Sequence, residues 1–407
     1  MRHVSRWLPW VFLGLTLTYT AVHWYGRVVP DTVTLKLEGQ SRAFMDFDVY
    51  HTAARRVIEG RTVYEQTDIA DDLPCIYEDP MEYIYTPLLA LTMTPLATVT
   101  PCTAEWIWLV LNVTLCLVAV PLLVLGLGLP RTPWVWGLAI GLVGAPMATL
   151  ETLSLGQVNF IVLVLMLGCV WLLRHDRMRP AAILLGLAAC LKIIPVLLGV
   201  FAVRQGGRRA LFWTGGATVL IIALSFLLAP KVSVGDYLAA VQTRTVGGMA
   251  MLNNSSWVAA MTRAYDPSPN VINWMSRLNM LLVGGVGLWA MWRCPAAAVS
   301  RWLPALSFAL AVAFTPVFQA HHAVLLYPAL LVLAVAAVQH PRWPWRLTKI
   351  ALVVILAVLL NSRGLIPLRE ANTVIEHLLV KPAWAGLWGV IVWLAVEMRQ
   401  DRVGVHG

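Results

Sequence analysis

Long apolar runs recur along the whole chain and are separated by shorter polar segments. Each run is close to the ~20 residues that a helix needs to cross ~30 Å of hydrocarbon. No polar stretch is large enough to fold alone, so residues 1–407 are expected to form a single membrane domain. The pattern predicts an all-α polytopic membrane protein with about ten crossing helices, over residues 8–26, 104–128, 134–150, 157–174, 210–230, 273–292, 302–318, 322–338, 346–361 and 383–398.

The composition agrees with this fold class. Hydrophobic residues make up 59% of the chain and charged residues 13%, and the mean hydropathy is +0.72. A soluble domain carries about a quarter charged residues, so the soluble class is excluded. The net charge of +9 is explained by arginines in cytoplasmic loops, and no nucleic-acid motif interrupts the pattern. Membrane lipids, and no nucleic acid, are the expected partners.

Basic residues collect in the N-terminal segment and in four loops, at 174–180, 204–209, 293–301 and 339–349. Such residues mark the cytoplasmic side of membrane proteins. We therefore expect a multi-pass protein of the plasma (inner) membrane with both termini in the cytoplasm and the first apolar run retained as an anchor. The extracytoplasmic side then receives four polar stretches, at 27–84, 151–156, 231–272 and 319–321.

Residues 180–203 break the simple alternation of sides, because arginine clusters flank them at both ends. If both ends are cytoplasmic, the segment cannot cross once. It is then a re-entrant hairpin of two half-helices, broken at Lys192–Pro195, because proline removes a helix hydrogen bond. A plain spanning helix with a proline kink is an equally open alternative.

The first outer loop, 27–84, carries two carboxylates at Asp46 and Asp48. After them, Val49, Ala53 and Val57 form one helical stripe that ends at Gly60, which predicts a short amphipathic helix on the membrane surface. Either carboxylate could cap this helix. Capping is the simpler interpretation for Asp48, whereas Asp46 is a catalytic candidate once the remaining polar features are counted.

Other polar side chains on the same side are candidates for ligand contacts. Lys192 lies in or near the hydrocarbon, where an ammonium group is costly and is a functional candidate by default; snorkelling is the alternative. Amide and hydroxyl groups suit sugar hydroxyls, a guanidinium suits phosphate, and each of them could instead satisfy backbone groups. These further candidates are Gln157, Asn159, Asn254, Ser255, Arg263, His321 and His322.

The six cysteines show no metal-binding spacing. Two of them, Cys75 and Cys102, fall on the expected oxidising side and could form a disulfide. The two adjacent histidines also lack metal spacing. No metal and no cofactor are therefore expected.

The polar blocks, in their order, resemble the polyprenyl-phosphate-sugar-dependent glycosyltransferases of family 87. These enzymes have the GT-C membrane fold and include mannosyltransferases and arabinofuranosyltransferases. The resemblance covers about residues 40–330 and rests on an Asp, Tyr, Ala-Ala, Gly, Tyr pattern followed by shorter motifs. The matching residues are Asp46, Tyr50, Ala53, Ala54, Gly60 and Tyr64, then Tyr85 with Pro87, Gly156 and Gln157 with Asn159, Lys192 with Pro195, Asn254 with Ser255 and Ser256, and His321 with His322.

The resemblance implies a role for each candidate. Asp46 corresponds to the general base of the first outer loop, and Lys192 with Arg263 would stabilise the departing phosphate. Sugar or acceptor contacts would come from Asp48, Tyr50, Gln157, Asn159, Asn254, Ser255, His321 and His322. The donor would be a polyprenyl-phosphate sugar, with mannose expected, and the acceptor a hydroxyl of a lipid or glycan. One base without an enzymatic nucleophile favours inversion.

Three alternatives stay open at this point. The sugar could be arabinofuranose instead of mannose. The protein could be a transporter or flippase of lipids or lipid-linked sugars, since re-entrant segments and intramembrane charges occur there too. It could also be an inactive assembly subunit. The lack of an inverted repeat, and candidate residues gathered on one face, favour the transferase over the transporter.

Overall fold

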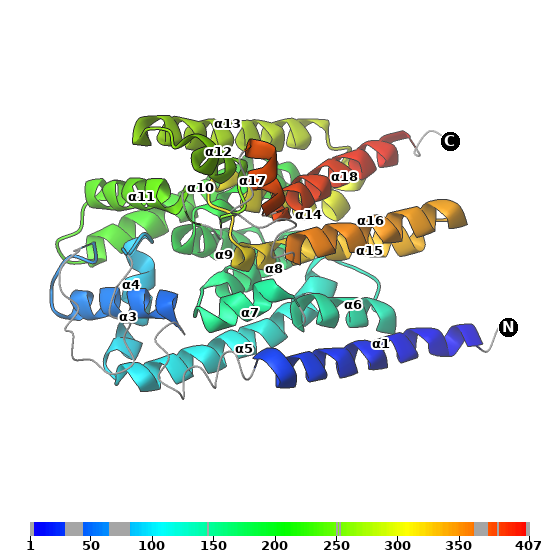
Figure 1. The fold of residues 1–407 in the computed structure, drawn as a ribbon, viewed down its shortest axis with the longest axis horizontal. Helices are drawn as coiled ribbons and strands as arrows, with labels where there is room; N and C mark the ends of the chain where they lie inside the picture. Colours follow the sequence, from blue (N-terminus) through cyan, green and yellow to red (C-terminus); the bar gives the residue numbers. More distant parts are fainter. Residues whose placement is uncertain are drawn as a thin grey trace.

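The computed structural model of the protein describes residues 4–28, 44–64, 82–144, 146–249, 251, 254–361, 373–380 and 382–403 (Figure 1). Within these residues the chain forms helices and no strands, which confirms the all-α class. The helices are α1 (Val4–His23), η1 (Trp24–Val28), α3 (Met45–Ile58), α4 (Pro87–Ala97), α5 (Pro101–Gly126), α6 (Pro133–Gly144), α7 (Met147–Ser154), α8 (Asn159–Arg174), α9 (Met178–Leu191), η3 (Ile194–Leu198), α10 (Gly199–Leu228), α11 (Val234–Met249), α12 (Trp257–Tyr265), α13 (Pro269–Arg293), η4 (Ala296–Ala298), α14 (Val299–Phe314), η5 (Ala320–Leu326), α15 (Tyr327–Gln339), α16 (Trp343–Asn361), α17 (Val374–Val380) and α18 (Ala383–Val403).

Every stretch predicted to cross the membrane is largely helical among the described residues. Among the described residues, five helical segments are long and apolar enough to cross, and six are if α6 and α7, which meet at 47°, form one broken span. The bend falls at Pro146, whose backbone is extended and precedes α7. This supports a multi-pass membrane protein, while the count of ten crossings stays a prediction.

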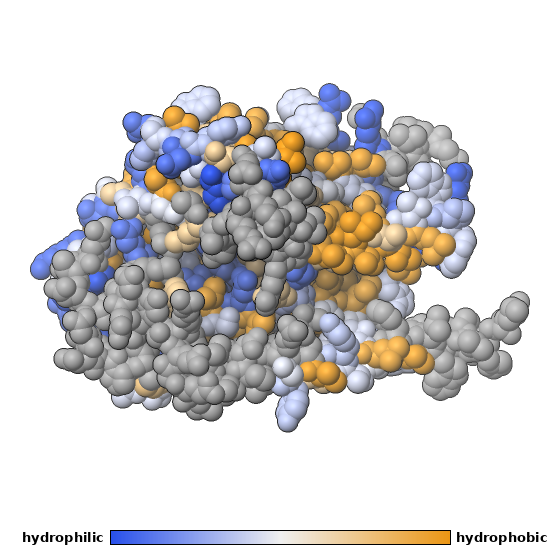
Figure 2. Space-filling model, in the orientation of Figure 1, coloured by the Kyte–Doolittle hydropathy of each residue, from blue (hydrophilic) through white to orange (hydrophobic). Residues whose placement is uncertain are grey.

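The core of the bundle is built around α14 and α15. Nearly every residue of both helices is buried, including Trp302, Phe308 and Tyr327. In contrast, α10 and α16 leave large apolar side chains such as Leu227 and Val358 exposed. Figure 2 shows apolar side chains gathered on the surface over α16. A helix that is buried all round belongs inside a bundle, and one with an exposed apolar face suits contact with lipid.

The segment expected to form a hairpin turns back on itself. Helix α9 ends at Leu191 and η3 begins at Ile194, so the helix is broken where the sequence predicted. A Cβ atom on Gly206 would overlap the side chain of Met178, which shows that the two ends of the segment lie side by side. At Gly207 the backbone leaves helical geometry (φ 59°, ψ −146°). The 14 residues of α9 span only about 21 Å. This geometry favours a hairpin over a single kinked helix, and its re-entry into a membrane stays a prediction.

The predicted cytoplasmic loops lie together at one end of the molecule, which we call the basic end. Arg174 donates to the carbonyl of Ser300 at 2.7 Å, and Arg204 donates to the carbonyl of Cys294 at 3.1 Å. Gln339 lines a small cavity with Arg174 and Ser300. The start of α1 and the end of α18 lie at the same end of the molecule in Figure 1.

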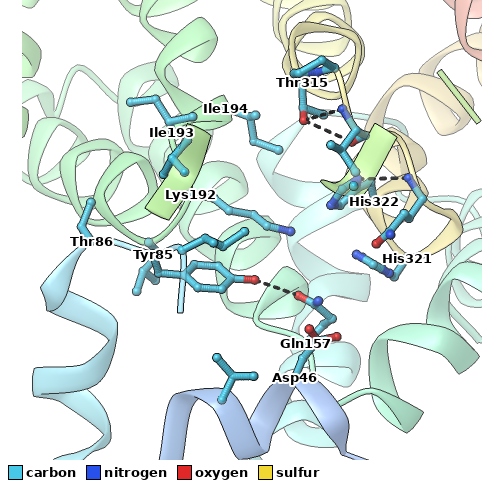
Figure 3. A pocket seen from close by; sticks show the side chains of 18 of the residues that line it. Asp46, Tyr85, Thr86, Gln157, Lys192, Ile193, Ile194, Thr315, His321 and His322 are labelled. Atoms are coloured by element: carbon cyan, nitrogen blue, oxygen red, sulfur yellow. Dashed lines mark hydrogen bonds between the residues drawn. The ribbon is translucent and has the colours of Figure 1, made fainter. Parts of the chain in front are cut away.

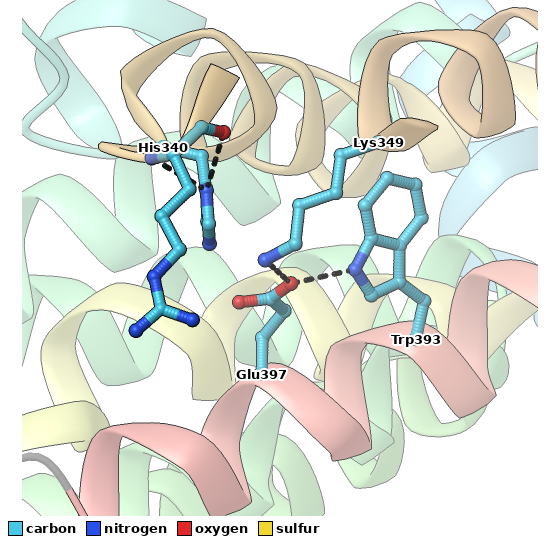
Figure 4. A network of polar contacts seen from close by, with 5 residues as sticks. His340, Lys349, Trp393 and Glu397 are labelled. Atoms are coloured by element: carbon cyan, nitrogen blue, oxygen red, sulfur yellow. Dashed lines mark hydrogen bonds and ion pairs between the residues drawn. The ribbon is translucent and has the colours of Figure 1, made fainter. Parts of the chain in front are cut away.

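A buried ion pair links two helices toward this basic end (Figure 4). The ammonium of Lys349 in α16 contacts the carboxylate of Glu397 in α18, and the indole of Trp393 donates to the same carboxylate at 2.7 Å. Arg346 donates twice to the carbonyl of His340, at 3.0 and 2.8 Å. These contacts hold α16 against α18 and against the loop before it.

The cysteines that the structure describes divide into two groups. Cys102, in the first turn of α5, is disulfide-bonded. Cys116, Cys169, Cys190 and Cys294 are free and buried. Cys75, its expected partner, lies outside the described residues.

Candidate functional site

Several candidate side chains that are far apart in the sequence line one cavity of about 230 Å³ (Figure 3). They come from α3, from the turn before α8, from the break after α9 and from η5. The candidates that line this cavity are Asp46, Tyr50, Gln157, Lys192, His321 and His322. We call it the central cavity.

The first turn of α3 holds Asp46 at the cavity. The backbone N–H groups of Phe44 and Asp46 donate to the carbonyls of Ser154 and Leu155, at 2.7 and 3.0 Å. The N-cap position is Phe44 in a left-handed conformation (φ 65°), so neither Asp46 nor Asp48 is the N-cap residue. Capping by a carboxylate, the simpler interpretation for Asp48, is therefore wrong. The free N–H groups of a helix start are satisfied here by the end of another helix.

The turn between α7 and α8 accepts α3 because it contains Gly156. This residue has φ +69°, and a Cβ atom there would lie 2.7 Å from the Cβ of Phe47. Its carbonyl also accepts a hydrogen bond from the indole of Trp108 at 2.7 Å. The glycine of the Gly-Gln-x-Asn motif is thus needed for the close approach of two backbones.

More of α3 is buried than the single apolar stripe that its sequence predicted. Helix α3 ends at Ile58, and Gly60 adopts φ +68°, as the stop signal predicted. Burial is wider than the stripe, because Phe47 to His51 are all buried against neighbouring elements, which include α4 and α5. Asp48 is among these buried residues and does not line the central cavity.

Two tyrosines and an amide form a hydrogen-bonded group on one wall. The hydroxyls of Tyr50 and Tyr85 are 2.9 Å apart, and both donate to Oε1 of Gln157, at 3.2 and 3.4 Å. Burial, with smaller contributions from Tyr85 and the Asp46 carboxylate, raises the pKa of Tyr50 well above its ordinary value. Its hydroxyl therefore keeps its proton and remains a hydrogen-bond donor.

Lys192 lies in the break between α9 and η3 with its amine directed into the cavity (Figure 3). Its Nζ donates to Oδ1 of Asn159 at 2.7 Å. Asn159 is fully buried, does not line the cavity, and donates through Nδ2 to the carbonyl of His321 at 2.9 Å. Asp46, His321 and His322 all lie within electrostatic range of the ammonium.

The adjacent histidines form one face of the cavity. Their rings are 4.4 Å apart between centroids and meet at 76°. Nδ1 of His322 accepts a hydrogen bond from the backbone N–H of Gln319 at 3.3 Å, so this ring also helps to cap η5. His322 therefore has a structural contact as well as a place at the cavity.

Three other candidates lie behind the cavity wall and do not line it. Asn254 donates to the carbonyl of Gly248 and accepts from the N–H groups of Ser256 and Phe318. Ser255 is buried and donates through its backbone to Phe318.

Arg263, the third of these candidates, donates to the carbonyls of Met251 and Asn254, at 3.2 and 3.0 Å. None of the three lines the central cavity, so their predicted sugar or phosphate contacts stay predictions. Their hydrogen bonds hold the backbone of the loops that form the wall.

The cavity also contains residues that the sequence analysis did not select. Glu82 adds a second carboxylate, and Tyr237 from α11 adds an aromatic ring. Only their position in the predicted outer loops pointed to them. Apolar side chains complete the lining, among them Ile193, Ile194, Met251, Met280, Phe314 and Val317.

The cavity therefore suits an amphipathic ligand that carries an anionic group and hydroxyls. The ammonium of Lys192 can bind an anion, and the carboxylate of Asp46 can accept a proton or hydroxyl hydrogen bonds. The apolar lining can cover hydrocarbon. Among the described residues, no group of three or more His, Cys, Asp or Glu side chains could hold a metal ion.

Comparisons with known proteins agree with this chemistry. The chain is 26% identical over 377 residues to the polyprenol-phosphate-mannose-dependent α-(1-2)-phosphatidylinositol mannoside mannosyltransferase of Mycobacterium tuberculosis, covering 87% of this chain and 80% of the relative. It is 27% identical over 350 residues to the protein of the same name in Mycolicibacterium smegmatis (79% and 74%). It is 28% identical over 192 residues to an α-(1→3)-arabinofuranosyltransferase of Corynebacterium glutamicum (46% and 43%).

No solved structure matches the chain significantly. The family comparison gives a match over residues 83–328, which is more than half of the sequence. This stretch contains the Gly-Gln-x-Asn motif, Lys192 and both cavity histidines, and Asp46 precedes it. The chain therefore belongs to glycosyltransferase family 87.

Proposed function

We propose that this glycosyltransferase moves mannose from a polyprenyl phosphate to a hydroxyl of a lipid- or glycan-linked acceptor, on the extracytoplasmic side of the membrane. The observation that carries the proposal is the meeting of Asp46 and Lys192 at one cavity with a partly apolar lining. A base for the acceptor and a cation for the departing phosphate are the two groups that this reaction needs.

The nature of the cavity supports a lipid-linked donor. Phosphate oxygens pair well with an ammonium group, which Lys192 supplies. Met251, Met280 and Phe314 offer apolar surface for the first isoprene units. Two of the three relatives described above carry polyprenol-phosphate-mannose dependence in their names, which favours mannose as the transferred sugar.

Two features support an extracytoplasmic site. Helix α8 has 16 residues and is about 24 Å long, and it carries Asn159, which contacts Lys192, at one end and Arg174 of the basic end at the other. Basic loops mark the cytoplasmic side, so the central cavity would open on the other side. The disulfide at Cys102 also suits an oxidising compartment.

The chemical step would be a single displacement. Asp46 accepts the proton of the acceptor hydroxyl while the hydroxyl oxygen attacks the anomeric carbon of the donor sugar. The bond from that carbon to the phosphate oxygen breaks, and the electron pair leaves with the polyprenyl phosphate. Lys192 stabilises the charge that develops on this leaving group. Attack opposite the leaving group inverts the anomeric centre, so a β-linked donor gives an α-linked product.

A reconstituted assay tests the proposal. Purified protein in vesicles receives radiolabelled polyprenyl-phosphate mannose and a phosphatidylinositol mannoside acceptor, with polyprenyl-phosphate arabinofuranose in a parallel reaction. We expect the label in a larger glycolipid with an α-linkage in the mannose reaction. If only arabinofuranose is transferred, the proposed sugar is arabinofuranose and not mannose. Passage of intact donor across the vesicle without transfer would overturn the proposal in favour of a flippase.

A further inference from the structure

We propose that Asn159 is a positioning residue that fixes the ammonium of Lys192 without cancelling its charge. This inference rests on the proposed function, in which Lys192 faces the departing phosphate. The sequence pattern favoured a sugar contact for Asn159, and the geometry points to a different role.

Lys192 has little local structure to hold its side chain. It follows the last residue of α9 with extended backbone (φ −145°, ψ 130°), and η3 starts two residues later. A lysine side chain has four rotatable bonds and a high rotamer entropy. An ammonium that must meet a phosphate oxygen therefore gains from a fixed partner, and Oδ1 of Asn159, at 2.7 Å, is that partner.

The second half of the amide sets the orientation of Asn159. Nδ2 donates to the carbonyl of His321 at 2.9 Å, so Oδ1 must face the ammonium. The reverse orientation would place an NH₂ group against an ammonium and a carbonyl against a carbonyl. Because Asn159 is fully buried and does not line the cavity, a sugar cannot reach it. The amide thereby connects the break after α9 to the histidine face of the cavity.

The neutrality of this partner matters for the donor. A carboxylate at the same place would hold the ammonium equally well, but it would neutralise the charge and repel an incoming phosphate. An amide oxygen stabilises the ammonium through a dipole and leaves the net positive charge for the ligand. The arrangement thus combines a fixed position with an available charge.

The first test is a double-mutant cycle on transfer. We expect Asn159→Ala to lower kcat/KM for the donor by about 10- to 100-fold, the range for a hydrogen bond to a charged group. In a Lys192→Ala background the same change should cost less than about 3-fold, because Asn159 acts through the lysine. Asn112→Ala, which removes another buried amide that lies outside the cavity, is the matched control and should leave transfer unchanged. A full 10-fold loss in the Lys192→Ala background would overturn the proposal.

The second test does not depend on transfer. Acetic anhydride acylates uncharged amines, and mass spectrometry can follow Lys192 and the exposed Lys231 in the same sample as pH varies. Since Oδ1 of Asn159 favours the charged ammonium, Asn159→Ala should move the acylation midpoint of Lys192 to lower pH and leave that of Lys231 unchanged. An unchanged midpoint for Lys192 would contradict the contact. A protein that passes this test and transfers no sugar would disprove the proposed function alone.

Discussion

Two lysines in this protein, Lys192 and Lys349, are placed in opposite electrostatic settings. Lys349 lies on the regular helix α16 and pairs with the carboxylate of Glu397, and the side chains of the pair are only 15% and 9% exposed. Lys192 lies in a helix break and bonds to the neutral amide of Asn159. The first charge is paired directly with a carboxylate, whereas the second has a neutral hydrogen-bond partner and faces a cavity that it shares with the Asp46 carboxylate. The comparison separates a lysine that holds two helices together from one whose ammonium faces a cavity, where we propose that it binds the donor phosphate.

The largest loss of transfer activity should come from changing Asp46, which lines the central cavity together with Lys192. Asp46→Asn keeps the shape of the side chain but cannot accept a proton, so we expect transfer to fall by at least about 10³-fold. The melting temperature should change little, because the backbone hydrogen bonds that hold the start of α3 stay in place. The reconstituted mannose assay measures this, and activity within 10-fold of the parent would remove Asp46 from its role.

The cavity lysine itself should give the next largest effect. Lys192→Ala removes the cation, and we expect kcat for the donor to fall by about 100-fold, with Lys192→Arg retaining clearly more activity because it keeps the charge. The ratio of the two variants is the informative quantity. Equal activities would show that Lys192 only holds the hairpin in place.

A smaller effect should follow from disturbing the turn that receives α3. Gly156→Ala places a Cβ atom 2.7 Å from that of Phe47 and requires a left-handed backbone, so the first turn of α3 must shift. We expect about a 10-fold loss of transfer in the same assay. Gly216→Ala is the control, because a Cβ atom there has no neighbour within 4 Å. Equal activities of the two variants would mean that the approach of α3 to α8 is not needed.

The smallest effect on transfer is expected at the other lysine. Lys349→Met leaves Glu397 buried without its partner and should lower stability by about 3 kcal/mol, while kcat of the folded protein stays unchanged. Adding Glu397→Leu should restore most of the loss, since no uncompensated charge remains. Thermal unfolding of both variants, with the transfer assay on the folded fraction, checks this. A 10-fold loss of kcat in Lys349→Met would contradict the purely structural role of Lys349.

Features with a local origin were predictable from the sequence. Apolar run lengths located the helices expected to cross the membrane but not α11 and α12, which lie in the predicted outer loop 231–272. Pro195 with the flanking arginines located the break next to Lys192. Gly60 marked the end of α3, because a glycine in the left-handed conformation commonly follows the end of a helix. Selecting Asp46 over Asp48 needed the family pattern in addition.

Features that depend on contacts between distant segments were not predictable in this way. The residues that neighbour Asn254 and Arg263 in the sequence do not indicate that the polar groups of these two side chains bind loop backbone. The same holds for Asn159, whose two partners come from residues 192 and 321. A single sequence reveals the hydrogen-bonding capacity of a side chain, and only the fold decides which groups use it.

The backbone bonds from α3 to Ser154 and Leu155 bear on how the enzyme is made. The ribosome produces Asp46 early, yet the carbonyls that seat it arrive with the α7–α8 turn, and the histidine face arrives only with η5. A nascent chain therefore holds Asp46 without these backbone partners until residues 154 and 155 have been made, and without the histidine face until residues 320–326 follow. If the proposed function holds, premature termination before η5 would leave a membrane-bound fragment that lacks the histidine face and cannot consume lipid-linked sugar.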